Sequence, residues 1–137
     1  MFTKYDIHTR DVIWADPRYA DQNEPKTRPL IVISQDIFHQ NSNFTVCVGT
    51  TTNVEKDPYL IPINPKDQMD FQFKQKCQVM CKRLVSLKCN LIQKKMGKVT
   101  PEFLESIIGK LRQDILYSVD FTSDFSSRSD STDIFRI

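Results

Sequence analysis

Glycine is scarce in this sequence, with three residues among 137. Loops that bind phosphate through the backbone, such as the P-loop and the dinucleotide-binding turn, need several glycines at fixed spacing, because the backbone must approach the phosphate closely. Neither fingerprint occurs, and neither does the glycine-flanked serine of the α/β-hydrolases. The common nucleotide-binding and hydrolase sites that depend on such loops are therefore excluded.

Long apolar segments are also missing. No stretch approaches the ~20 residues that a helix needs to span a bilayer. The residues after Met1 do not form the apolar run of a secretory leader. We therefore expect a cytoplasmic protein that does not associate with a membrane.

The cysteines do not indicate a metal centre. Cys77 and Cys81 stand four residues apart, but a second ligand pair is missing, and both histidines, His8 and His39, lie far from them in the sequence. In a reducing compartment the four thiols should stay free. We expect them to pack as small core residues, and we expect no metal and no cofactor.

Charge is distributed unevenly. The net charge is +2, yet residues 71–101 contain no Asp or Glu. We call this segment the basic window; its cations are Lys74, Lys76, Lys82, Arg83, Lys88, Lys94, Lys95 and Lys98. Such a pattern is typical either of an ordinary solvated surface or of a face that binds a polyanion.

The last part of the chain differs in composition from the rest. Residues 119–137 are rich in Ser and carry four Asp against two Arg. A segment of this kind buries too little apolar area to offset the entropy lost on ordering. We predict one compact domain, residues 1–118, followed by a flexible Ser/Asp-rich tail, 119–137.

Short apolar runs separated by polar or proline-containing links predict strands. The second run, residues 29–34, is apolar on both faces and should be central, whereas Pro62 indicates that the fourth run, residues 59–63, lies at an edge or contains a bulge. The alternation of the fifth run, residues 77–87, breaks at Arg83-Leu84, which indicates either a bulge or an exit of the strand from the core. Between the second and third runs we expect a helical turn capped by Asp36 and docked by Ile37 and Phe38. The five predicted strands are 11–16, 29–34, 44–50, 59–63 and 77–87.

One helix is predicted near the end of the domain. Thr100 is suited to the N-cap and Pro101 to the first helical position. An apolar stripe follows at helical spacing, and the helix should end near Ser118. The stripe consists of Leu104, Ile107, Ile108, Leu111 and Ile115. The order of elements predicts a mostly β protein, a small antiparallel barrel with a C-terminal helix.

Two polar residue types stand at the ends of neighbouring apolar strands. Arg28 precedes the run from Pro29 to Ser34, and Thr50-Thr51-Thr52-Asn53 follows the next run. A guanidinium and a hydroxyl at adjoining strand ends make a suitable cradle for a phosphate group. A structural cation and threonines chosen for β propensity are the alternative interpretation.

Together these residues resemble the MazF/PemK family of toxin endoribonucleases from toxin–antitoxin pairs. The resemblance runs from about Arg10 to Leu116 and rests on residues 11–16, 27–34, Thr50-Thr51 and 97–100. It implies an SH3-like barrel of about five to seven short antiparallel strands with a C-terminal α-helix, usually a homodimer. Such proteins cut single-stranded RNA without metal: a 2′-hydroxyl attacks the adjacent phosphorus and leaves a 2′,3′-cyclic phosphate and a 5′-hydroxyl. A cognate antitoxin neutralises them by covering the RNA groove with an acidic segment.

The resemblance assigns catalysis to Arg28 and Thr51. A guanidinium can place two parallel bonds on the equatorial oxygens of the transition state, and a hydroxyl can add a third. No general base is evident, and His8 and His39 are candidates only as alternatives to ordinary surface or loop histidines. RNA contacts are expected from Tyr19, Lys26, Thr50, Thr52, Asn53, Gln78, Lys82 and Arg83.

The sequence also departs from the family pattern. Cys77 replaces a frequent serine, Lys82 and Arg83 replace positions that are often acidic and amide, and Val85-Ser86 replaces an Arg-Thr pair. The base-reading surface has therefore changed, and the cut sequence does not transfer. Two other functions stay open: a non-catalytic toxin of the CcdB kind that binds a protein such as DNA gyrase, and a barrel that binds RNA without cutting it.

Overall fold

A computed structural model describes residues 1–53 and 56–117 of the chain. The predicted tail, 119–137, lies outside the described residues. Among these residues two α-helices are formed, α1 (Asp36–Ser42) and α2 (Pro101–Lys110), and a π-helical turn, Leu111–Ile115, continues α2. The described strands are β1 (Asp11–Ala15), β2 (Arg28–Val32), β3 (Phe44–Thr51), β4 (Leu60–Ile63), β5 (Gln68–Met69), β6 (Cys77–Lys88) and β7 (Lys94–Val99).

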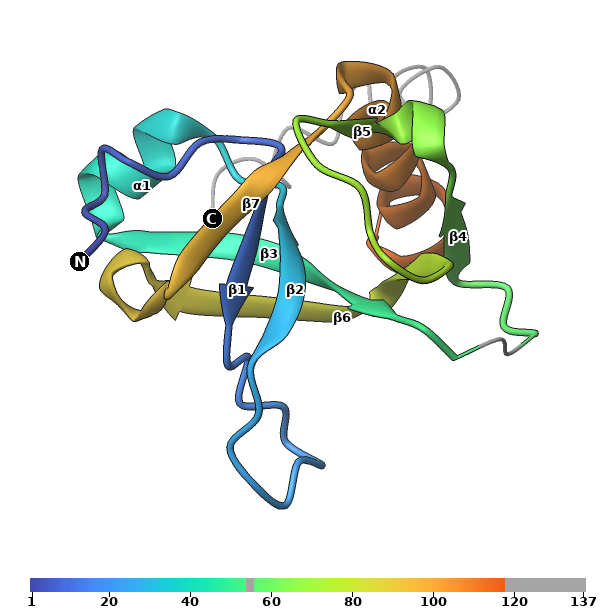
Figure 1. Ribbon diagram of the computed structural model, residues 1–137, viewed down its shortest axis with the longest axis horizontal. Helices are drawn as coiled ribbons and strands as arrows, with labels where there is room; N and C mark the ends of the chain where they lie inside the picture. Colours follow the sequence, from blue (N-terminus) through green and yellow to red (C-terminus); the bar gives the residue numbers. More distant parts are fainter. Residues whose placement is uncertain (54–55, 118–137) are drawn as a thin grey trace, which may run out of the picture.

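The strands form one sheet in the order β4-β6-β3-β2-β1-β7-β5, and every pairing in it is antiparallel. The sheet curls into a nearly closed barrel, with α2 packed on one side and the loop between β1 and β2 projecting from it (Figure 1). The predicted fold class, a mostly β barrel with a C-terminal helix, is confirmed. The predicted edge position of the strand that contains Pro62 is confirmed as well, since β4 ends the sheet.

Strand β2 lies in the middle of the sheet and contributes side chains to two apolar clusters, one on each of its faces. Ile31 packs into the cluster that α2 covers, whereas Leu30 and Val32 point into the second cluster, with Ile13 and Cys47. All three β2 side chains are fully buried. Burying one such side chain contributes about 1.5–3 kcal/mol, so the β2 backbone and its Arg28 end are held firmly.

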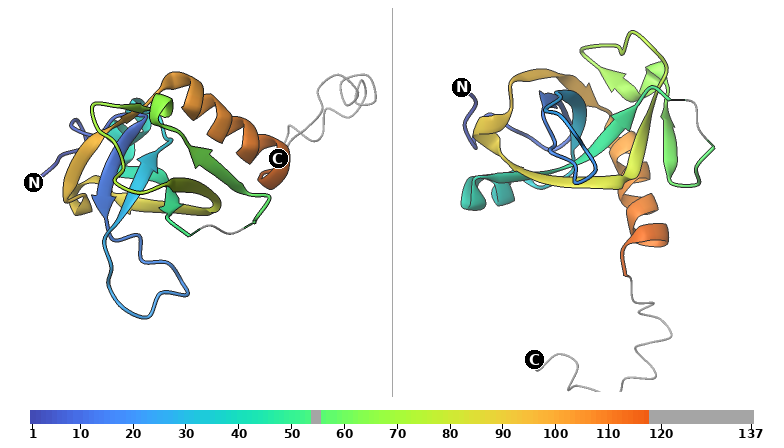
Figure 2. Two further views of the ribbon diagram at one scale, coloured as in Figure 1. Left: turned by 45° about the vertical axis from the view of Figure 1, so that its right-hand side comes forward. Right: turned by 90° about the horizontal axis from the view of Figure 1, so that it is seen from below.

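Helix α2 begins as predicted, because the Thr100 hydroxyl accepts a bond from the Phe103 amide at 3.1 Å. The buried stripe is centred on Phe103, Ile107 and Leu111, so Phe103 was missed and Leu104 is only half-buried. The helix runs alongside β4 (Figure 2). No helix among the described residues is long and apolar enough to cross a membrane.

The prediction for the segment between β2 and β3 is wrong in detail. The side chain of Asp36 does not cap α1; it accepts from the Thr9 amide at 2.9 Å instead. Ile37 and Phe38 are exposed, at 55% and 41%. The residue that docks α1 is His39, which is fully buried and donates from Nδ1 to the Ile7 carbonyl at 2.9 Å. A polar network therefore replaces the expected apolar contact.

The predicted break in the fifth run is a bulge in β6. On one side of it Val48 pairs with Leu84, and on the other side Gly49 pairs with Met80. Residues 81–83 of β6 therefore loop out opposite a continuous β3. Cys77, Val79 and Cys81 point into the core, as predicted for the two cysteines. After Cys81 the next two side chains, Lys82 and Arg83, leave the core.

Candidate functional site

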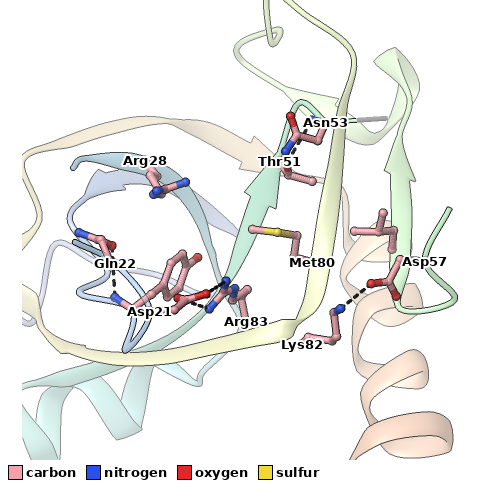
Figure 3. A pocket seen from close by; sticks show the side chains of 11 residues that line it. Asp21, Gln22, Arg28, Thr51, Asn53, Asp57, Met80, Lys82 and Arg83 are labelled. Carbon is pink, nitrogen blue, oxygen red and sulfur yellow. Dashed lines mark hydrogen bonds and ion pairs between the residues drawn. The ribbon is translucent and has the colours of Figure 1, made fainter. Parts of the chain in front are cut away.

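A cavity of about 320 Å³ lies where the ends of β2 and β3 meet the bulge of β6 (Figure 3). Six of the residues singled out in the sequence line it: Tyr19, Arg28, Thr51, Asn53, Lys82 and Arg83. They come from the start of β2, the end of β3 and the residues just after it, the β1–β2 loop, and the bulge of β6. The bulge matters because it turns two consecutive cations toward the opening.

Arg28 and Thr51 lie at adjoining ends of two paired strands, β2 and β3. Leu30 of β2 is paired with Gly49 of β3, and Arg28 and Thr51 each lie two residues beyond that pair. Both residues line the cavity, and Figure 3 shows Arg28 on one side of it and Thr51, next to Asn53, on the other.

Both side chains have bonding capacity left for a ligand. The Nε of Arg28 is buried and makes no hydrogen bond to any described residue. The Thr51 hydroxyl accepts from the Asn53 amide at 3.1 Å, which leaves its own hydrogen free to be donated. A fixed cation and an alcohol donor therefore converge on one space, which suits an anionic oxygen.

Arg83 forms the opposite wall together with the β1–β2 loop. Its two terminal nitrogens donate to the two Asp21 oxygens at 2.8 and 2.7 Å. The Arg83 hydrogen bond holds the pKa of Asp21 below its usual range, and the same bond raises the pKa of Arg83. The pair is mostly solvent-exposed on the Asp21 side, with 65% of that side chain accessible.

Tyr19 lies between the two arginines. The centre of its ring is 5.6 Å from the Arg28 guanidinium carbon and 4.5 Å from that of Arg83. Burial raises the pKa of the Tyr19 phenol, and the two arginines oppose that shift. The hydroxyl is buried without a hydrogen-bond partner among the described residues.

Lys82 is paired on the far side of the cavity. Its ammonium group lies 2.5 Å from an Asp57 oxygen. This bond lowers the pKa of Asp57, whose other oxygen accepts from the Tyr59 amide at 2.8 Å. Each cation of the bulge therefore has one carboxylate, supplied by a different loop.

The other four residues predicted to contact RNA do not line this cavity. Thr50 is buried, and its hydroxyl donates to the Pro29 carbonyl at 2.9 Å. Lys26 borders a separate depression near Asp16. Gln78 pairs with Thr51 within the sheet, and Thr52 is exposed.

Neither histidine lines the cavity. His39 is fully buried in the α1 network, and His8 pairs with Asp36 at 2.9 Å elsewhere on the surface. Among the described residues, no group of three or more His, Cys, Asp and Glu side chains is arranged to hold a metal ion. The four thiols are free and buried, as predicted.

Sequence reasoning missed five lining residues: Asp21, Gln22, Asp57, Leu60 and Met80. Asp21 and Gln22 belong to the polar loop that precedes Arg28, so their closeness to Arg28 in the sequence could have indicated them. Nothing in the sequence indicated that Asp57 belongs to the site, because it does so only through its ion pair with Lys82, which the tertiary fold forms.

Comparison with known proteins places these observations in a family. A model of PemK-like, MazF-like toxins of type II toxin–antitoxin systems matches residues 8–115. No curated protein matches the chain.

Solved structures share the fold. A mycobacterial endoribonuclease in complex with its cognate antitoxin is 19% identical, with a TM-score of 0.62 over 77% of this chain and 90% of that one. MazF from Deinococcus radiodurans is 13% identical, with a TM-score of 0.64 over 81% and 94%. MazE–MazF from the same organism is 12% identical, with a TM-score of 0.59 over 81% and 93%.

Proposed function

Because this chain belongs to the family of PemK-like, MazF-like toxins of type II toxin–antitoxin systems, we propose that it is an endoribonuclease that cuts single-stranded RNA. The observation that carries the proposal is the convergence of Arg28 and Thr51 on one cavity. The endoribonuclease function of the structural relatives supports it.

The proposed reaction is attack of a 2′-hydroxyl on the adjacent phosphorus. A bond forms from the 2′-oxygen to phosphorus as the 2′-hydroxyl gives up its proton, and the bond to the 5′-oxygen breaks as that oxygen takes up a proton, which gives a 2′,3′-cyclic phosphate and a 5′-hydroxyl. Negative charge gathers on the equatorial oxygens as this happens. Arg28 binds those oxygens with its fork of N–H donors, and Thr51 donates a further bond. Losing one such donor typically costs about 3–4 kcal/mol of barrier.

The walls of the cavity are proposed to hold the substrate strand. Lys82 and Arg83 supply cations to flanking phosphates, and Asn53 supplies an amide at the end of β3. The Tyr19 ring offers a stacking surface to an unpaired base, worth about 1–3 kcal/mol when used. Affinity should therefore fall steeply as salt rises.

Membership in the family implies an antitoxin partner. We propose that an acidic segment of that partner competes with RNA for the cations at the bulge. We also propose that the protein acts as a homodimer in the cytoplasm, and that residues 1–118 form the toxin domain with 119–137 as an appended tail.

The test is to incubate the purified protein with mixed-sequence RNA in EDTA. Cleavage that survives EDTA and is lost in Arg28→Ala supports the proposal. Intact RNA together with inhibited DNA supercoiling by gyrase contradicts it and favours a toxin that binds a protein. RNA that is bound but stays intact contradicts it too.

A further inference from the structure

The guanidinium of Arg83 is contacted in two ways at once. Asp21 binds its edge through two parallel hydrogen bonds of 2.8 and 2.7 Å. Tyr19 lies on its face, with the ring centre 4.5 Å away. A carboxylate on the edge and an aromatic ring on the face occupy the two positions by which arginine binds a nucleotide, since phosphate takes the edge and a base takes the face.

Both contacts come from one loop that is tied into a unit. Asp16 anchors the loop by accepting from the Arg18 amide at 2.9 Å, from Gln22 Nε2 at 2.8 Å and from the Lys26 amide at 3.2 Å. Gln22 in turn accepts from the Tyr19 amide at 3.2 Å. Tyr19 and Asp21 are therefore presented to Arg83 together, two residues apart.

The backbone of Gly49 forms the floor of the space that the Tyr19 hydroxyl fills. A Cβ atom on Gly49 would lie 2.1 Å from the Tyr19 hydroxyl, so only glycine leaves room there. The hydroxyl that fills this room has no partner among the described residues. A buried hydroxyl without a hydrogen bond is unfavourable, so the polar end of Tyr19 is not what holds the ring in place.

An anion from solution can compete with Asp21 for the guanidinium of Arg83. The Asp21 side chain is 65% exposed, so an incoming anion can reach Arg83 through water. Arg28, whose Nε is buried without a hydrogen-bond partner among the described residues, lines the same cavity. The site thus has an exchangeable anion and donor capacity left over.

We propose that Arg83 and the floor at Gly49 form a nucleotide-binding subsite, which in the free protein is filled by Tyr19 and Asp21 of the chain itself. The inference rests on the proposed function in that the nucleotide would belong to the RNA strand. RNA then binds only when the loop releases Arg83, so the loop lowers affinity for RNA. In the free protein Asp21 competes with phosphate and Tyr19 competes with a base at Arg83; once the loop has released Arg83, the Tyr19 ring is free to stack on an unpaired base of the bound strand.

The test compares Asp21→Asn with Glu24→Gln in binding to adenosine monophosphate, followed by calorimetry or by NMR of the arginine side chains. Glu24 is an exposed carboxylate of the same loop that makes no ion pair with any described residue, so both variants remove one negative charge. Asp21→Asn should bind the nucleotide about twofold to fivefold more tightly than Glu24→Gln, the range expected for loss of one exposed ion pair. Adding Arg83→Ala should abolish binding in both backgrounds.

Two further ligands separate the halves of the subsite. Adenosine lacks the phosphate and ribose 5-phosphate lacks the base, and each should bind more weakly than adenosine monophosphate. Equal affinity of the two variants, weaker binding by Asp21→Asn, or no binding by either variant would overturn the inference.

The same preparations are scored for cleavage of mixed-sequence RNA. Cleavage without a difference in nucleotide binding refutes the subsite and leaves the endoribonuclease proposal standing. The expected difference in nucleotide binding without any cleavage supports the subsite and refutes the endoribonuclease proposal.

Discussion

Arg28 at the start of β2 and Thr51 at the end of β3 line the same cavity. The strand register decides which threonine takes this place. Side chains alternate between the faces of a strand, so the neighbouring Thr50 points the other way, where it is buried and bonded to the Pro29 carbonyl. Three consecutive threonines therefore have different surroundings: Thr50 is buried, Thr51 lines the cavity and Thr52 is exposed.

The register predicts opposite effects for two matched substitutions. Thr51→Val should lower the cleavage rate by about 10²–10³, because it removes a donor to the transition state, with little change in thermal stability. Thr50→Val should instead lower stability by about 0.5–1.5 kcal/mol through loss of the buried hydrogen bond to the Pro29 carbonyl, and should leave the rate of the folded protein nearly intact. Initial rates and thermal unfolding on both variants check this. A larger rate loss in Thr50→Val would show that the register is wrong.

Tyr19 and Gly49 should be coupled. Tyr19→Phe removes a buried hydroxyl that lacks a partner, so it should leave stability unchanged or raise it by up to about 1 kcal/mol. Gly49→Ala should destabilise the native loop, because the added Cβ meets that hydroxyl at 2.1 Å.

The double variant provides the control for this pair. Gly49→Ala should be less damaging when Phe replaces Tyr19, and denaturant unfolding of the four proteins measures the interaction. Strict additivity of the two changes would contradict the described packing.

The thiols should be inert in the folded protein. Burial raises the pKa of Cys47 to about 12 and that of Cys81 to about 11. Since the reactive species is the thiolate, a disulfide reagent at pH 8 should modify these cysteines slowly in the native state and rapidly in denaturant. Iodoacetamide treatment of the folded protein should leave RNA cleavage unchanged. Rapid native-state labelling of Cys47 with loss of cleavage would contradict this expectation.

Much of the fold followed from local patterns. Apolar runs and prolines placed β1 to β4 and β6, and the Thr100-Pro101 signal placed α2, because these features act within a few residues. β7 was missed, since Lys94, Lys95 and Lys98 interrupt its apolar pattern and its pairing partner β1 lies more than 80 residues earlier in the chain. The docking of α1 through His39 was also invisible, because a histidine gives no sign of being buried until Ser34 and Ile7 are brought to it.

In the site, too, the residues that local sequence patterns place could be predicted, and the residues that depend on distant partners could not. Arg28 and Thr51 stand at strand ends, where the sequence pattern itself places them. Asp21 became part of the site only through Arg83, a residue 62 positions away. Asp57 depends in the same manner on Lys82 and on the bulge that turns Lys82 outward. Partners of this kind are set by the tertiary fold.

The central claim is that Arg28 and Thr51 stabilise attack by a neighbouring 2′-hydroxyl. The most direct test maps a cut in one defined transcript and repeats the reaction with a single 2′-deoxy substitution at the mapped position, with the products analysed by mass spectrometry. The account predicts a 2′,3′-cyclic phosphate and a 5′-hydroxyl from the native transcript and no cut at the deoxy position. A cut that persists at the deoxy position, or a 5′-phosphate on the product, would contradict it.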